Sequence, residues 1–156
     1  MTTRILFICL GNICRSPLAE GIFLHLAQQA GRAHEFEIDS AGTYEGHVGQ
    51  LPDPRSRTTA ELHGIRLNHR ARQVERRDLD RFDMIMAMDY ENQMELLSLA
   101  PNHVAKIKLM REYDPKANGD LNVPDPYYGA RDGFEVVYKM LERSARELLR
   151  SIPQKN

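Results

Sequence analysis

A cysteine, a glycine and an arginine lie close together near the start of the chain, in the segment Cys9-Leu10-Gly11-Asn12-Ile13-Cys14-Arg15-Ser16-Pro17. The apolar run at residues 4–9 predicts a buried strand that ends at the cysteine. Ser16 followed by Pro17 predicts the start of a helix, with Ser16 as its N-cap and Pro17 as its first residue. The segment is therefore expected to be a loop between the end of a strand and the N-terminus of a helix.

This loop has the residue types of an anion-binding site. Backbone N–H groups and the positive end of the helix point at one place in such a loop, and Gly11 permits a turn that other residues resist. The planar guanidinium of Arg15 is suited to two phosphate oxygens at once. A positive field of this kind favours the thiolate form of Cys9, and Ser16 can donate a hydrogen bond to the sulfur. The pattern indicates a cysteine nucleophile in a pocket shaped for phosphate.

An aspartate between two prolines supplies a second reactive group, in the segment Val123-Pro124-Asp125-Pro126-Tyr127-Tyr128-Gly129. Pro126 biases Asp125 away from helical conformations, and Pro124 stiffens the approach to it. A carboxyl group held in such a turn can donate or accept a proton during a reaction.

The elements that must position these residues alternate between strand and helix. Strands are expected at residues 4–9, 36–40, 84–88 and 107–109, and helices at 16–30, 57–63, 90–99 and from 134 onward. Gly31 and Gly64 are expected to end the first two helices, Asp89 to cap the third, and Asp132 with Glu135 to cap the last. The alternation predicts one α/β domain over residues 1–156, a central four-stranded parallel sheet with helices on both faces. Ligands bind beyond the carboxyl ends of the strands in such sheets.

Length and composition exclude several other classes of protein. At 156 residues, 42% hydrophobic and 28% charged, the chain has the composition of a single globular domain. The formal net charge of -1 gives no general attraction to nucleic acid or to an anionic membrane. The apolar run at residues 5–10 is far shorter than the ~20 residues that cross a bilayer, and too short for a secretory signal. We therefore expect a cytoplasmic protein without membrane insertion.

The spacing of cysteines and histidines argues against structural cross-links and metal sites. The two cysteines, Cys9 and Cys14, make no disulfide framework, and the six histidines show no metal-binding spacing. We expect no metal and no cofactor. An arginine-rich stretch at residues 66–81 is either a solvated face or a docking surface for an anionic partner.

Taken together, these motifs resemble the signature of the low-molecular-weight protein tyrosine phosphatases, a family of cysteine-based phosphatases. The resemblance begins at residues 5–20 and continues through Asp39-Ser40-Ala41-Gly42-Thr43, Pro52-Asp53-Pro54-Arg55, His69 with Ala71-Arg72, and Asp125-Pro126-Tyr127-Tyr128-Gly129. It covers nearly the whole chain in the family's order. It implies a flavodoxin-like fold and hydrolysis of phosphotyrosine and small aryl phosphates through a cysteinyl-phosphate intermediate. It also implies phosphotyrosine-containing protein substrates and a monomer or weak homodimer.

The resemblance assigns catalytic roles to Cys9, Arg15 and Asp125. Asp125 is implied to protonate the tyrosine leaving group and then to activate water against the cysteinyl-phosphate. The residues implied to contact phosphate or substrate are Leu10, Gly11, Asn12, Ile13, Cys14, Ser16, Tyr44, Tyr127 and Tyr128.

Further residues are implied to support the loop or protect it. The family holds its loop with a hydrogen-bond network whose members match Asn12, Ser16, Ser40 and His69. An asparagine at position 12 also tolerates a left-handed backbone. Cys14 is implied to form a reversible disulfide with the nucleophile that shields it from over-oxidation.

One position departs from the family pattern. Gly46 stands where the family usually carries an aromatic residue, after the motif Ser-Ala-x-Thr. Tyr44 lies two residues earlier and is expected to fill the same space.

Other interpretations differ from a tyrosine phosphatase at specific residues. Arsenate reductases of similar fold need further cysteines downstream, and the chain has none after Cys14. Protein-arginine phosphatases that resemble the family carry a threonine at the position of Ile13, and isoleucine favours phosphotyrosine. A catalytically inactive phosphopeptide-binding module is expected to lack Cys9 or Asp125, and both are present. We predict a protein tyrosine phosphatase, with a protein-arginine phosphatase as the alternative.

Overall fold

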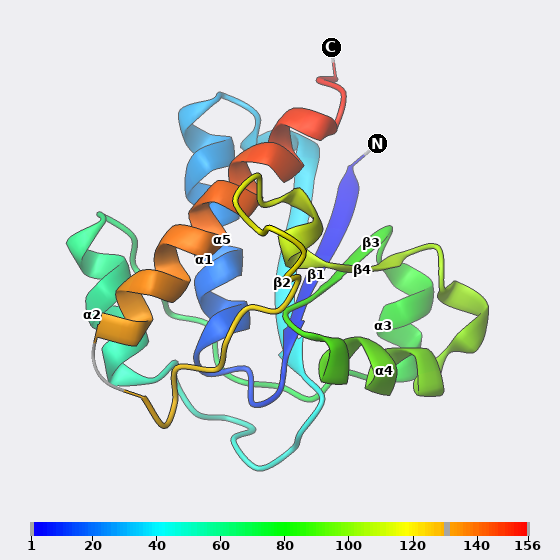
Figure 1. Cartoon of the computed structure of the whole chain (residues 1–156). Coiled ribbons are helices and arrows are strands. Elements are labelled where there is room, and N and C mark those ends of the chain that lie inside the picture. Colours follow the sequence, from blue (N-terminus) through cyan, green and yellow to red (C-terminus); the bar gives the residue numbers. More distant parts are fainter. Residues whose placement is uncertain (1, 130–131, 156) are drawn as a thin grey trace.

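The computed structural model describes residues 2–129 and 132–155 of the chain (Figure 1). The strands are β1 Thr3–Cys9, β2 Phe36–Gly42, β3 Met84–Ala87 and β4 Ile107–Leu109. The helices are α1 Arg15–Gln29, α2 Pro54–Leu62, α3 Arg76–Arg81, α4 Tyr90–Leu99 and α5 Asp132–Ser151, with short 3₁₀ helices at Ala33–Glu35, Pro101–His103 and Met110–Tyr113.

The four strands form one parallel sheet in the order β2-β1-β3-β4. β1 is central, and its last residue, Cys9, pairs with Gly42 at the end of β2. Because all four strands run in the same direction, their carboxyl ends lie at one edge of the sheet. Figure 1 shows that the loops after β1 and β2, and the segment leading into α5, gather at this edge, the lower end of the sheet in the view.

Both faces of the sheet are covered by helices, as the sequence predicted. Ile5 and Phe7 pack on one side of β1 into a core that includes α1 and α5. Leu6 and Ile8 pack on the other side into a core that includes α3 and α4. A strand buried on both faces must be apolar at every position, which explains the unbroken hydrophobic run in β1. The predicted α/β fold with a four-stranded parallel sheet is confirmed.

The helices differ from the prediction at α2, α3 and α5, and also at the start of α1, which is described with the site. α2 begins at Pro54, with Asp53 as N-cap accepting a hydrogen bond from the Arg55 N–H, rather than at Arg57. α3 was not predicted, because its six residues include five charged ones and only Leu79 faces the core. The predicted cap of the last helix at Asp132 is wrong, because this residue already belongs to α5. The position before it lies outside the described residues.

The predicted glycine stops and the cap of α4 are confirmed. Gly31 and Gly64 follow α1 and α2 with φ angles of 70° and 78°, the left-handed backbone that ends a helix. Asp89 caps α4 by accepting a hydrogen bond from the Asn92 N–H.

Within the arginine-rich stretch, several side chains are engaged in ion pairs. Arg72 pairs with Asp39 and Asp78, and Arg81 pairs with Glu37. These contacts hold the stretch against β2 and join Arg72 to α3 within the stretch. Among the helices of the described residues, none combines the length and apolar character needed to cross a bilayer.

Candidate active site

The sulfur of Cys9 lies at the end of β1, beneath the loop of residues 9–16. The residue is 2% exposed. Its Sγ accepts a hydrogen bond from the Asn12 backbone N–H at 3.3 Å and lies 3.0 Å from the Ser16 hydroxyl. Ser16 Oγ accepts a hydrogen bond from the Asn12 side-chain amide, and its own proton can be donated either to the sulfur or to the Ala41 carbonyl at 3.4 Å. The Asn12 N–H and the Ser16 hydroxyl therefore face the sulfur, and both can stabilise a negative charge placed on it.

The prediction that Ser16 caps the first helix is wrong. α1 begins at Arg15, two residues before the predicted first residue Pro17, and its N-cap is Cys14, which makes no side-chain hydrogen bond. The Ser16 hydroxyl instead turns toward the sulfur and the interior of the loop. The first-turn N–H groups of α1 thus receive no capping side chain and remain available to an anion held in the loop.

Asn12 holds the loop from inside with every hydrogen-bonding atom of its amide. Its backbone is left-handed, with φ 56°, as predicted. Its Nδ2 donates to Ser16 Oγ at 2.8 Å and to Ser40 Oγ at 3.0 Å. Its Oδ1 accepts from the Arg72 N–H at 3.0 Å and from His69 Nε2 at 2.9 Å. The four residues expected to form a supporting network therefore do meet.

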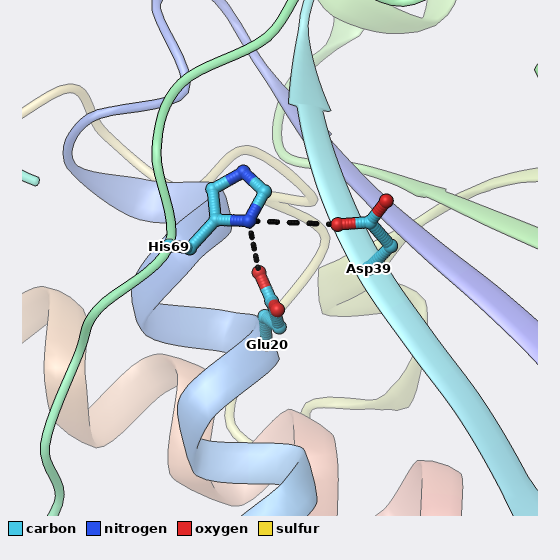
Figure 2. Close-up of side chains that lie close together, drawn as sticks. All are labelled: Glu20, Asp39 and His69. Carbon is cyan, nitrogen blue, oxygen red and sulfur yellow. Dashed lines mark ion pairs between the residues drawn. The ribbon is translucent and has the colours of Figure 1, made fainter. Parts of the chain in front are cut away.

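A cluster of titratable side chains continues this network away from the sulfur (Figure 2). Figure 2 shows Glu20 on α1 and Asp39 on β2 facing Nδ1 of His69, at 3.6 Å and 3.5 Å. The Ser40 hydroxyl donates to Glu20 Oε1 at 2.5 Å. Burial raises the pKa of Glu20 to about 7, and burial also lowers the pKa of His69. The proton content of the cluster thus changes near neutral pH.

Among the described residues, Glu20, Asp39 and His69 form the one group of side chains that could hold a metal ion. Their ligand atoms lie within 4.8 Å of one another. However, Arg72 donates a hydrogen bond to Asp39 Oδ2 at 3.1 Å and so brings a positive charge to the cluster. The Ser40 hydroxyl already donates a hydrogen bond to the Glu20 carboxyl group. These contacts favour a role in supporting the loop over cation binding.

Arg15 extends from the first turn of α1 to the carboxyl end of β3. Its Nη1 donates to Asp89 Oδ2 at 2.7 Å and to the Val123 carbonyl at 2.9 Å, and the residue is 2% exposed. Burial opposes its charge, but the nearby Cys9 and Asp89 raise the pKa of Arg15 above its ordinary value. The guanidinium is therefore charged and held in one orientation. Asp89, which also caps α4, was not predicted as a site residue.

Asp125 lies across the cavity from the 9–16 loop. Its Oδ2 is 3.7 Å from Arg15 Nη2, and its Oδ1 accepts a hydrogen bond from the Tyr127 N–H at 3.0 Å. Its side chain is 37% exposed, so solvent can reach the carboxylate. An acid in this position can exchange a proton both with a bound group and with water.

Arg55 anchors the segment that carries Asp125. Its Nη2 donates to the Tyr127 carbonyl at 3.0 Å, and its guanidinium lies 4.6 Å from the centre of the Phe134 ring. Asp53 holds the same guanidinium, and the Asp53 N–H donates to the Ile13 carbonyl at 2.8 Å. This chain of contacts ties the acid-bearing segment to the 9–16 loop.

A cavity of about 100 Å³ brings most of the predicted site residues together. Its lining residues are Cys9, Leu10, Gly11, Ile13, Cys14, Arg15, Tyr44, His47, Asp125, Tyr127 and Tyr128. Asn12, Ser16, Ser40 and His69 lie behind the loop, in the supporting network.

His47 was not predicted. Its ring centre is 6.1 Å from those of Tyr44 and Tyr127, so it closes an aromatic rim between them. We call Tyr44, His47, Tyr127 and Tyr128 the rim. A histidine in a glycine-rich loop carries no spacing signal that could have placed it there.

Close contacts with neighbouring side chains explain why glycine stands at positions 11 and 46. Gly11 does not have a positive φ, and a Cβ there would lie 2.8 Å from the His47 ring, so the expected reason for this glycine is wrong. A Cβ on Gly46 would lie 2.1 Å from the Tyr44 ring. Tyr44 therefore occupies the space in front of Gly46, as expected.

Cys14 lies in the same loop but in a different environment. It is 5% exposed and packs with Ile13, Ala71 and Phe134. Burial, together with the charges of Asp53 and Cys9, raises the pKa of the Cys14 thiol far above its ordinary value. Both cysteines are free, and the protective disulfide between them stays a prediction.

Comparison with known proteins identifies close relatives of the chain. The family described as low molecular weight phosphotyrosine protein phosphatase matches residues 4–156. A protein from Streptomyces coelicolor named low molecular weight protein-tyrosine-phosphatase is 46% identical over 155 residues, which cover 97% of this chain and 94% of that protein.

Solved structures of similar proteins share the fold. A protein tyrosine phosphatase from Entamoeba histolytica, with Hepes in its active site, superposes with a TM-score of 0.91 at 37% identity, covering 96% of both chains. A Drosophila arginine phosphatase superposes with a TM-score of 0.88 at 33% identity, covering 97% of this chain and 99% of that one.

Proposed function

Because the chain belongs to the low molecular weight phosphotyrosine protein phosphatase family, we propose that it hydrolyses phosphotyrosine in proteins with Cys9 as the nucleophile. The observation that carries this proposal is the convergence of Cys9, Arg15 and Asp125 on one small cavity. The three residues come from two segments more than 100 positions apart, and they are the types that phosphoryl transfer through cysteine requires.

The first step transfers the phosphoryl group to the enzyme. Cys9 Sγ attacks phosphorus and forms an S–P bond while the P–O bond to the tyrosine breaks. Asp125 gives its proton to the leaving phenolic oxygen. Arg15 and the N–H groups at the start of α1 bind the non-bridging oxygens, whose charge they balance as the bond breaks.

The second step returns the enzyme to its starting state. A water molecule transfers a proton to the Asp125 carboxylate as its oxygen attacks phosphorus, and the S–P bond breaks. Inorganic phosphate leaves, and the Cys9 thiolate is regenerated between the Ser16 hydroxyl and the Asn12 N–H. The reaction needs no cofactor.

The walls of the cavity support an aromatic leaving group. Ile13 is 7% exposed and has no hydroxyl to offer a polar guanidino group. Tyr44, His47 and Tyr127 present ring faces and edges around the entrance, which suits the flat ring of phosphotyrosine. These features favour phosphotyrosine over phosphoarginine as the substrate.

The proposal is tested by phosphate release from three peptides that differ only in carrying phosphotyrosine, phosphoarginine or phosphoserine. We expect the phosphotyrosine peptide to be turned over fastest. Cys9→Ser should abolish turnover without unfolding the protein, because a hydroxyl is far less acidic than a thiol. Acid quenching should trap phosphate on Cys9 in the parent and in Cys14→Ser, but not in Cys9→Ser. Turnover by Cys9→Ser, or faster release from phosphoarginine, would overturn the proposal.

We further propose that residues 1–156 act as one phosphatase domain in the cytoplasm, as a monomer or weak homodimer. The low cysteine content supports this location, because two cysteines five positions apart do not make the disulfide framework of a secreted protein. Cell fractionation and sedimentation of the purified protein test the location and the oligomeric state.

A further inference from the structure

A second and larger cavity adjoins the one that holds Cys9. Its volume is about 680 Å³, within the range of small-ligand sites. It shares Leu10, Arg15, Tyr44 and Asp125 with the smaller cavity and extends from there over the start of α4. A substrate bound at Cys9 must therefore pass next to it.

The surface contributed by α4 is negative. Glu91 and Glu95 line the cavity, are exposed, and lie four residues apart on one face of the helix. Neither makes an ion pair with another side chain in the described part of the chain. Arg15 is the one basic residue among the described residues that line this cavity, and its charge is balanced by Asp89 at 2.7 Å. The cavity thus has a surplus of negative charge.

Helix stability accounts for a glutamate at position 91 but not for a second one at position 95. Glu91 lies in the first turn of α4, where a carboxylate interacts favourably with the helix dipole. Glu95 lies beyond that turn, and two like charges four residues apart repel each other and destabilise a helix. A cationic occupant would remove this repulsion.

Other lining groups suit the same occupant. Tyr44 and Tyr90 are 52% and 46% exposed, so their rings are open to a cation–π contact. Asn92, which also lines the cavity, is 2% exposed and adds an uncharged polar side chain to its wall.

We propose that this cavity is a subsite for the lysine or arginine side chain of a residue close to the phosphotyrosine of the substrate. The proposal rests on the proposed function, since it takes a phosphotyrosine bound above Cys9 as its starting point. Each residue of an extended peptide advances the chain by about 3.3–3.6 Å. A long basic side chain one or two positions from the phosphotyrosine can therefore cross the shared wall at Leu10 and Tyr44 and reach Glu91 and Glu95.

The test compares phosphotyrosine peptides that differ at one flanking position. Each position within two residues of the phosphotyrosine carries in turn lysine, norleucine or glutamate, and kcat/KM is measured for every peptide. At the position that reaches the cavity we expect lysine to exceed norleucine by about fivefold, the size of two partly exposed charge pairs. This ratio should shrink as salt rises from about 0.05 M to about 0.5 M, because exposed charges are screened.

Variants of α4 locate the effect. The double change Glu91→Gln with Glu95→Gln should reduce the lysine-to-norleucine ratio to about one, while Glu91→Lys with Glu95→Lys should make glutamate the preferred flanking residue. Glu61→Gln changes an exposed glutamate on α2 that lines neither cavity, and it should keep the parent ratio. Because each value is a ratio within one variant, a common effect on the chemistry cancels.

The outcomes separate this inference from the proposed function. If no peptide releases phosphate, the proposed function fails. If the peptides are hydrolysed but lysine and norleucine are equal at every position, the subsite is refuted. A lysine preference that survives the double change to glutamine also refutes it, because the selecting charge then lies elsewhere.

Discussion

The 9–16 loop and the rim face the same cavity but differ in how firmly they are held. Cys9, Asn12 and Ser16 are at most 2% exposed, and side-chain hydrogen bonds join them to one another. Tyr44 and Tyr128 in the rim are 52% and 92% exposed and rest on ring contacts. The groups proposed to bind phosphate are thus held by hydrogen bonds within the protein, whereas those proposed to surround the leaving group are open to solvent.

This difference separates chemistry from selectivity. Preorganised donors stabilise charge without having to reorient during the reaction, and this requires burial and full hydrogen bonding. Exposed rings contribute contact area to many phosphotyrosine peptides. We therefore expect changes in the loop to lower kcat strongly and changes in the rim to alter KM mildly.

Among changes that keep the Cys9 nucleophile, the largest effect that we predict is for Asp125→Asn, at the boundary between the two regions. General acid catalysis typically contributes about 10²–10⁴-fold, so phenyl phosphates with poor leaving groups should slow by this factor. A very acidic phenol needs little protonation and should slow far less. The measurement is the rate across a series of phenols of rising pKa. A loss that is uniform across the series would assign Asp125 to positioning instead.

Arg15→Lys tests whether the buried loop acts through geometry rather than charge alone. Lysine keeps the positive charge but loses the fork that can hold Asp89 and phosphate together. We expect kcat to fall by about 10²–10³-fold, as for loss of a preorganised donor. Arg32→Lys is the matched control, because Arg32 is also buried and ion-paired, with Glu35, but lines neither active-site cavity. A loss smaller than about tenfold, or 1.4 kcal/mol, would remove Arg15 as the phosphate clamp.

The sequence predicts a region well when its interacting residues are close together in the chain, and poorly when they are far apart. The loop could be predicted because its chemistry is contained in consecutive residues from Cys9 to Ser16, and a short apolar strand before it defines its direction. The partners of Arg15 could not. Asp89 and the Val123 carbonyl come from positions 74 and 108 residues away, and only the sheet order brings them to the guanidinium.

The rim was predicted only in part for the same reason. Tyr127 and Tyr128 lie two and three residues after Asp125, so the sequence motif locates them. His47 and Arg55 act through packing against Gly11 and Tyr127, contacts that no residue spacing encodes. Ser16 shows the opposite error. Serine before proline is a strong signal for the start of a helix. Here the Ser16 hydroxyl contacts the Cys9 sulfur instead, so a tertiary contact overrides the local preference.

The cluster behind the loop should make stability depend on pH. The pKa of Glu20 is raised from 4.5 to about 7 by burial, so the folded state holds its proton where the unfolded state has lost it. Stability is then highest below pH 4.5 on this account and falls as the pH rises to about 7. At about 1.4 kcal/mol for each unit of pKa, the change is at most about 3.5 kcal/mol.

Glu20→Gln isolates this contribution. Glutamine can still accept the Ser40 hydrogen bond but has no proton to lose, so the variant should gain stability relative to the parent between pH 4.5 and pH 8. His69, whose pKa is lowered by burial, contributes in the opposite direction at acidic pH in both proteins. Urea unfolding of both proteins across this range gives the difference directly. A difference that does not change with pH would mean that Glu20 is ionised throughout.

The smallest effect that we predict lies in the rim, at Tyr44. Its ring fills the space in front of Gly46, where a Cβ would lie 2.1 Å from it. Because aromatic contacts contribute about 0.5–1.5 kcal/mol beyond area burial, Tyr44→Ala should raise KM for a phosphotyrosine peptide by about threefold to tenfold. The acid limb of its pH–rate profile should stay as in the parent. Gly46→Trp alone should clash with Tyr44, but combined with Tyr44→Ala it should lower KM again, since the indole then has room. If the double variant binds peptide no better than Tyr44→Ala, an aromatic ring at position 46 cannot replace the ring of Tyr44. The contact with peptide would then depend on the Tyr44 side chain itself.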